Sequence, residues 1–93
     1  MIDNSKFEKI IKIDESIIKD KNRNLITIET VDSSGLLANI AKVFFDNNVS
    51  IYSARINTLG ERVEDTFEIE NFNKKLVPNY KIKKIVSKLK KVV

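Results

Sequence analysis

The chain has 93 residues, with 17 Lys and Arg, 13 Asp and Glu, and no Cys or His. This length fits one domain. Without Cys there is no disulfide or thiolate metal site, and without His there is no imidazole base, although carboxylates alone can bind Ca²⁺ or Mg²⁺. No apolar run approaches the roughly 20 residues of a membrane span, and the N-terminus lacks a signal-peptide core. We therefore expect a cytoplasmic protein with no membrane partner.

The net charge of +4 is unevenly distributed along the chain. Residues 74–93 contain eight Lys and no acidic residue, whereas residues 1–73 contain nine Lys and Arg against thirteen Asp and Glu. The positive charge therefore comes from the last segment, and the body of the chain is acidic.

The first 22 residues form a lead-in to a domain that we place at residues 23–93. Within the lead-in, the segment EKIIKID at 8–14 has the composition of an edge strand that could pair with the strand after it. The alternative is a helix over 5–18, with Ser5 and Glu8 as a capping box. We predict the strand and keep the helix as the alternative.

The run LITIETV at 25–31 is rich in β-branched residues and predicts a strand. It ends at Asp32-Ser33-Ser34-Gly35, which contains good helix N-cap residues. Apolar side chains then follow helical spacing and predict a helix over 36–47, with a broad apolar face suited to packing on a sheet.

Segments 49–58 and 61–70 predict a hairpin joined through Leu59-Gly60. A loop of these two residues sets the cross-strand partners, because a slip by one residue would mix the two faces. The predicted pairs are Ile56 with Val63, Ala54 with Asp65, Tyr52 with Phe67, and, on the other face, Arg55 with Glu64.

Pro78 predicts the start of a second helix. Its apolar stripe consists of Ile82, Ile85, Val86, Leu89 and Val93. The element order is β-α-β-β-α, which predicts an α+β, ferredoxin-like fold with an antiparallel sheet and two helices on one face. Too few residues follow the last helix to form a closing strand, so we expect the strand at 8–14 to take that place.

Two sequence blocks carry a resemblance to a known family. Residues 32–37 resemble the D-x-x-G-L-L signature of ACT domains, which are small-molecule sensing modules of this topology. Residues 53–67, SARINTLGERVEDTF, resemble the second hairpin of the ACT domains that end bifunctional PII uridylyltransferase/uridylyl-removing enzymes. The lead-in over 9–25 is similar to that family's as well, and the resemblance spans about residues 8–91.

The resemblance implies a regulatory domain that senses glutamine and sets the balance between uridylylation and deuridylylation of the PII signal protein. The nucleotidyltransferase and hydrolase domains of such an enzyme lie outside this chain, so no catalysis and no cofactor is expected within it. The implied partners are glutamine, PII through the parent enzyme, and either a second copy of the chain in a homodimer or another ACT domain.

The turn after the first strand of the domain is the candidate ligand site. The exposed amides expected at this helix start, those of Ser34, Gly35, Leu36 and Leu37, favour a carboxylate. Asp32 is placed to receive an ammonium group. The resemblance further implies that Asp32 and Ser50 hold the ligand across a dimer interface. The candidate ligand-binding residues are Asp32, Ser33, Ser34, Gly35, Leu36, Leu37 and Ser50. The simpler interpretation is that Asp32 or Ser33 caps the helix and Gly35 permits tight packing.

This chain departs from the family pattern at two candidate positions. The family usually has Arg-Pro where Ser33-Ser34 stand, and Asn or Asp is commoner than Ser50. A cation beside the ligand and a proline-stiffened helix start are therefore missing, which bears on ligand affinity and identity.

Asp65 shares a face with apolar residues by strand alternation, which is a costly position for an unpaired carboxylate. The simplest role for Asp65 is structural, through backbone amides or an Arg, and the alternative is a ligand or domain contact.

Two other function classes need weighing. The chain shows no nucleophile, metal or phosphate-loop motif, which argues against an enzyme. An RNA- or protein-interaction module on the same scaffold is the alternative to a sensor, because the last helix is rich in lysine. RNA-recognition sheets stack bases on exposed aromatics, however, and the predicted open face is acidic and lacks them, so no nucleic-acid partner is expected. Its residues are Ser53, Arg55, Glu64, Thr66 and Glu68.

Overall fold

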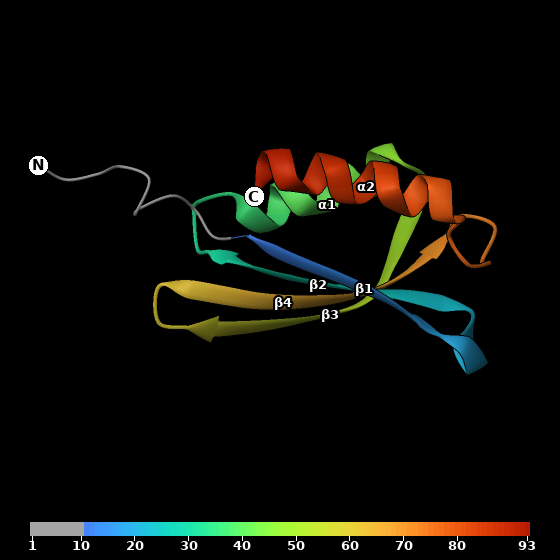
Figure 1. Ribbon diagram of the computed structural model, residues 1–93, viewed down its shortest axis with the longest axis horizontal. Coiled ribbons are helices and arrows are strands. Elements are labelled where there is room, and N and C mark those ends of the chain that lie inside the picture. The colour runs from blue at the N-terminus through green and yellow to red at the C-terminus, as the bar shows by residue number, and fades with distance from the viewer. Residues whose placement is uncertain (1–10) are drawn as a thin grey trace, which may run out of the picture.

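The computed structural model describes residues 11–93, which form a four-stranded sheet and two helices (Figure 1). The elements in chain order are β1 (Lys12–Ile18), the 3₁₀ turn η2 (Lys19–Lys21), β2 (Arg23–Val31), α1 (Leu36–Asp46), β3 (Val49–Leu59), β4 (Arg62–Asn71) and α2 (Asn79–Val92).

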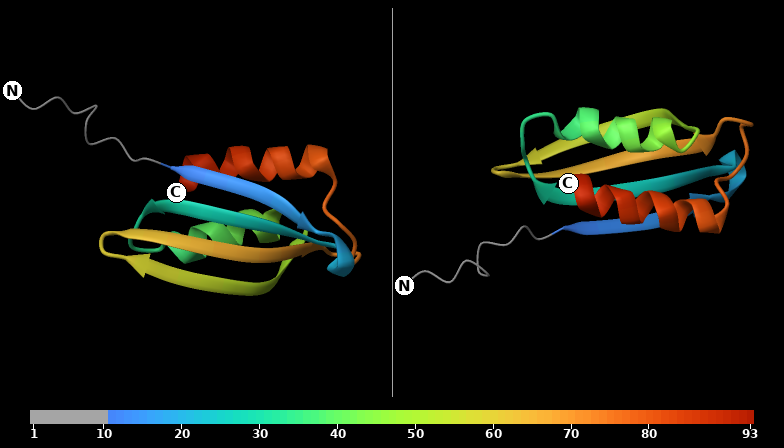
Figure 2. Two further views of the ribbon diagram at one scale, coloured as in Figure 1. Left: turned by 60° about the horizontal axis from the view of Figure 1, so that its bottom comes forward. Right: turned by 90° about the horizontal axis from the view of Figure 1, so that it is seen from above.

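The sheet has the order β1-β2-β4-β3, and every neighbouring pair is antiparallel. Both helices lie on one face, with α2 over the β1–β2 half and α1 over the β4–β3 half (Figure 2). The other face, called the open face below, carries no helix. This arrangement confirms the predicted ferredoxin-like α+β fold.

A strand from the lead-in occupies the sheet edge beside β2, as predicted. Its pairs run from Lys12 with Glu29 to Ile18 with Arg23, so the strand begins later than expected and continues to Ile18. Residues 8–10 lie outside the described part of the chain. The alternative helix is wrong over 12–18, because pairing with β2 satisfies the backbone groups of this segment.

The β3–β4 hairpin turns one residue later than predicted. Leu59 pairs with Arg62, so the turn is Gly60-Glu61, and Gly60 has a positive φ of 68° that glycine adopts without strain. Each residue of β3 therefore faces a partner two positions further along β4 than expected.

The predicted hairpin pairs are wrong, although the faces are right for Ser53–Leu59 because the shift is even. On the helix-covered face, Ile56 is opposite Asp65, Ala54 is opposite Phe67 and Thr58 is opposite Val63. On the open face, Arg55 is opposite Thr66, so the expected pairing with Glu64 does not form. An irregularity between Ile51 and Ser53 leaves Tyr52 without a partner in the ladder.

The core lies between the helices and the covered face of β2 and β4, where alternate residues are buried. Phe44 of α1 meets Phe67 of β4 edge-to-face, with ring centroids 5.5 Å apart. Pro78 is the N-cap of α2, and Ile82, Ile85 and Leu89 are buried as the stripe predicts.

Candidate functional site

The turn between β2 and α1 lies at the same end of the sheet as the β3–β4 turn (Figure 1). The Asp32 amide donates to the Glu61 carbonyl oxygen at 2.9 Å, which ties the two turns together. Asp32, Ser33, Ser34 and Gly35 are all exposed. The predicted turn residues are thus brought together on one accessible end of the molecule.

No side chain caps the start of α1. Gly35 is the N-cap residue, with φ 77°, and neither the Asp32 nor the Ser33 side chain hydrogen-bonds to the helix start. A Cβ at Gly35 would meet nothing within 4 Å, so this glycine serves its backbone conformation. The simpler interpretation, with a capping side chain and a glycine needed for packing, is therefore wrong.

Some amides of the first turn are already used. The Leu36 amide donates to the Ser33 carbonyl at 3.2 Å, and the Asn39 amide donates to the Gly35 carbonyl at 3.0 Å. Leu36 is also buried, whereas Leu37 is exposed. The expectation that the Leu36 amide is free is wrong. The Leu37 amide has no acceptor within residues 11–93 and stays available to an anion at the positive end of the helix dipole.

Two buried polar side chains lie on the helix-covered face close to this turn. Asp65 is 1% exposed and Thr30 is 0% exposed. Thr30 is opposite Val63 and Asp65 is opposite Ile28, which makes Thr30 and Asp65 diagonal neighbours on adjacent strands. Asp32 continues the same alternation as Thr30 beyond the end of β2.

Neither buried group is fully hydrogen-bonded. Asp65 Oδ1 and Thr30 Oγ1 have no hydrogen-bond partner within residues 11–93. Burial raises the pKa of Asp65, a hydrogen bond from the Asn57 backbone lowers it, and the Asp32 charge raises it further. Asp65 is thus a buried carboxylate within the field of a second one, an arrangement that attracts a cation.

Sequence reasoning placed Asp65 on the buried face correctly but missed Thr30. The signal for Thr30 was present, because it has the same strand parity as Ile26 and Ile28 in a run that predicts a half-buried strand.

Ser50 lies far from the other candidates. It pairs with Glu70, at the end of β3 opposite the hairpin turn, and the intervening strand spans about 30 Å at 3.3 Å per residue. It lines a largely apolar hollow of about 380 Å³ with residues that include Phe45 and Ile51. A single copy of the chain therefore does not bring Ser50 to the Asp32 turn.

The open face carries a charged cluster rather than a stacking platform. The Arg23 guanidinium lies 3.3 Å from the Tyr52 ring centroid and pairs with Glu68 at 3.3 Å and Glu70 at 3.7 Å. The expectation that this face lacks aromatics is wrong, because the irregularity in β3 takes Tyr52 out of the predicted pairing with Phe67. The guanidinium covers one side of this ring, which is otherwise exposed, and the acidic side chains of Glu68 and Glu70 beside it do not suit a nucleic acid.

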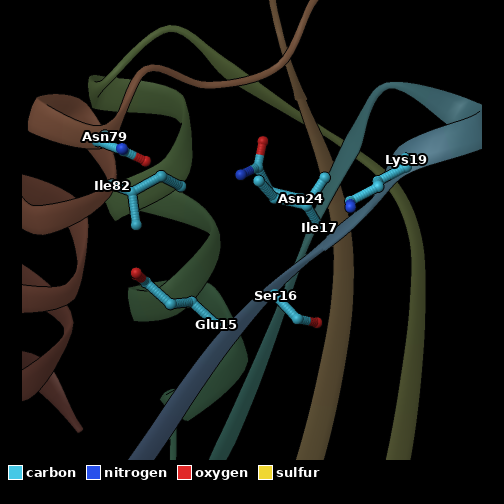
Figure 3. A pocket seen from close by; sticks show the side chains of 7 residues that line it. All are labelled: Glu15, Ser16, Ile17, Lys19, Asn24, Asn79 and Ile82. Carbon is cyan, nitrogen blue, oxygen red and sulfur yellow. The ribbon is translucent and has the colours of Figure 1, made fainter.

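A second hollow of about 290 Å³ lies at the far end of the sheet, between β1, the start of β2 and the start of α2 (Figure 3). Its buried polar group is Asn24, whose Oδ1 accepts the Val77 amide at 2.8 Å. Asn24 therefore anchors the loop before α2. No other polar residue among those that line the hollow is buried.

The β3 edge is unpaired and exposed along most of its length. Every residue from Ile51 to Leu59 is exposed, and exposed apolar side chains of α1 flank the same side, including Phe45 at 70%. Long, exposed apolar edge strands pair readily with other strands.

Metal binding by clustered side chains and a membrane-spanning helix find no support in the described residues. Within residues 11–93 no group of three or more His, Cys, Asp or Glu is arranged to hold a metal ion. Neither α1 nor α2 has the length and apolar character to cross a membrane.

Comparison with known proteins links the chain to one kind of enzyme. It is 38% identical over 68 residues to the bifunctional uridylyltransferase/uridylyl-removing enzyme of Psychrobacter cryohalolentis, covering 73% of this chain and 7% of that protein. The enzyme of the same description from Acinetobacter baumannii strain AYE is 37% identical over 78 residues, or 84% of this chain and 9% of that protein. No protein-family model matches the chain. No solved structure matches it either.

The chain spans less than a tenth of the length of these relatives. What they share with it is therefore one small region. The chain is an α+β domain homologous to a short part of bifunctional uridylyltransferase/uridylyl-removing enzymes.

Proposed function

We propose that the chain is an ACT-type regulatory domain that binds glutamine and, within a uridylyltransferase/uridylyl-removing enzyme, controls the uridylylation and deuridylylation of PII. The observation that carries the proposal is the uncapped start of α1 beside Asp32. The homology to these enzymes and the two sequence blocks at 32–37 and 53–67 support the choice of ligand and parent protein.

The chemistry of the turn suits an amino-acid zwitterion. Its carboxylate accepts from amides of the first turn, such as that of Leu37, and benefits from the helix dipole. Its ammonium group is attracted to the Asp32 carboxylate, which is exposed and makes no side-chain cap. Both charges of the ligand thus find complementary charge at this end of the sheet.

The unpaired β3 edge supports a homodimer formed by two such edges. Antiparallel pairing around a two-fold axis would place the start of one β3 beside the end of the other. The partner's Ser50 would then approach the hairpin turn whose Glu61 carbonyl binds the Asp32 amide. This pairing joins the two halves of the candidate site that a single copy keeps apart.

The test is calorimetric titration of the 93-residue chain with L-glutamine, together with thermal unfolding. A ligand that binds only the folded state and is present at 100 times its Kd stabilises the fold by about 2.7 kcal/mol. Asp32→Asn should weaken binding, whereas Asp20→Asn, an exposed acid in η2 at the other end of the sheet, should not.

The proposal fails if no amino acid shifts the unfolding temperature at millimolar concentration. Salt-sensitive binding of RNA in place of amino-acid binding would favour the nucleic-acid alternative instead.

A further inference from the structure

The helix-covered face contains a buried carboxylate whose presence is explained neither by apolar packing in the core nor by the β2–α1 turn. Asp65 is buried in an otherwise apolar row of β4, between Val63 and Phe67. Its Oδ1 atom and the Oγ1 atom of its diagonal neighbour Thr30 both have no partner within residues 11–93. A buried carboxylate oxygen without a partner is costly, and its persistence points to a group that completes it.

Asp65 is buried close to the exposed β3 edge of the sheet. It lies one strand in from the β3 edge, and Ile56, which is opposite it on β3, is 47% exposed. Thr58 flanks the same spot from β3, because it is opposite Val63. Thr30, Thr58 and Asp65 therefore lie at neighbouring register positions of β2, β3 and β4, close to the β2–α1 turn.

We propose that Asp65, with Thr30 beside it, receives the ammonium group of the bound amino acid, while the start of α1 receives its carboxylate. This inference rests on the proposed function and deepens it, since it assigns the cationic half of the ligand to the covered face of the sheet. Asp32, which is exposed at the end of β2, is near enough for its charge to act on Asp65 and adds negative charge there. The two ends of a zwitterion then contact two separate elements, α1 and β4.

The charge balance supports an ammonium rather than a metal ion. Asp65 and Asp32 supply two carboxylates and Thr30 a hydroxyl, and residues 11–93 offer no third acid to complete a metal site. A primary ammonium carries three donors on one centre, which matches a small set of acceptors of this kind. An amine is therefore the ligand group that this position fits.

The experiment compares two ligands on the wild-type 93-residue chain and three variants of it. L-Glutamine and glutaramic acid, which is glutamine without its α-amino group, are titrated into wild type, Asp65→Asn, Thr30→Val and the control Glu64→Gln. Glu64 is the neighbour of Asp65 on the open face of β4. Thermal unfolding of each variant establishes that it is folded.

We expect wild type to bind glutamine and to discriminate strongly against glutaramic acid. Asp65→Asn should weaken glutamine binding about 10- to 100-fold, as loss of a charge-assisted hydrogen bond does. The same substitution should leave glutaramic acid binding unchanged, so that the two ligands bind alike. Thr30→Val should weaken glutamine binding by a smaller factor, and Glu64→Gln should bind both ligands as wild type does.

Three outcomes overturn the inference. Equal binding of both ligands by wild type would show that the ammonium is not recognised, whatever the variants do. Glutamine binding within two-fold of wild type in Asp65→Asn would refute the role of Asp65 alone and leave the proposed function standing. No glutamine binding by wild type would refute the proposed function and this inference together.

Discussion

Replacing Asp65 with Asn should stabilise the ligand-free protein at pH 7. Asp65 accepts one backbone hydrogen bond, from Asn57, and its Oδ1 atom has no partner within residues 11–93. A buried acceptor left unsatisfied costs about 1–3 kcal/mol, and more when it is charged. Asparagine keeps the shape and the Asn57 contact and removes the buried charge. The free energy of unfolding is expected to rise by about 1–3 kcal/mol, and Tm by at least about 4 °C for a domain of this size.

The gain should depend on pH in a defined direction. Burial raises the pKa of Asp65 above its ordinary value of 3.8, a backbone hydrogen bond from Asn57 opposes this, and the Asp32 charge adds to it. The folded state therefore binds this proton more tightly than the unfolded chain does. Lowering the pH through the folded pKa stabilises wild type, and this gain is complete below the unfolded value. The advantage of Asp65→Asn should accordingly be largest at pH 7 and shrink toward pH 4.

Urea unfolding at several pH values measures this difference directly. Asp46→Asn is the control, because Asp46 is exposed and pairs with Lys42 four residues earlier at 2.9 Å. Such a surface pair contributes at most about 1 kcal/mol. A loss of more than about 1 kcal/mol in Asp65→Asn at pH 7 would refute the reasoning, since it would mean that the carboxylate makes a stabilising contact.

Three further results are expected. Phe44→Ala should lower the free energy of unfolding in urea by about 3–5 kcal/mol, because Phe44 is buried. Phe45→Ala should lower it by less than about 1 kcal/mol, because Phe45 is exposed. Equal losses in the two variants would contradict the packing described. Asn24→Ala should cost about 1–3 kcal/mol, since it leaves the buried Val77 amide without its acceptor, and an unchanged unfolding midpoint would show that this contact is dispensable. Ile51→Lys should change the sedimentation profile from dimer to monomer, because a lysine on an edge strand opposes strand pairing. The circular dichroism spectrum should stay unchanged. A dimer that persists in this variant would place the interface elsewhere.

The sequence predicted the elements of this fold well because its periodicities are strong. The stripe ending in Leu89 and Val93 and the alternation around Ile26 are set by burial on one face, and the structure reproduces both. The register of the β3–β4 hairpin was harder to predict from the sequence. Both turn placements keep the same residues on the covered face, so the apolar pattern cannot choose between them, and the conformation of Gly60 decides.

The candidate site was predictable only in part. The turn at 32–35 was recognised from its residue types, but whether Asp32 caps α1 depends on local backbone geometry, which composition does not specify. Thr30 has a buried-face parity, yet its lack of a partner is a property of its three-dimensional neighbours. The separation of Ser50 from the turn likewise follows from the direction of β3 rather than from any motif.

The position of β1 has a consequence for how the chain folds. The sheet is a circular permutation of one in which the strand beside β2 comes last, after the second helix. Because β1 precedes β2, its pairs join residues close in sequence, such as Ile18 with Arg23, and the loop to be closed is short. Local pairing of this kind lowers the contact order and the entropy cost of loop closure. A closing strand after α2 would pair with the strand most distant from it in sequence. In the observed order, the strand in that place pairs with the segment that directly follows it.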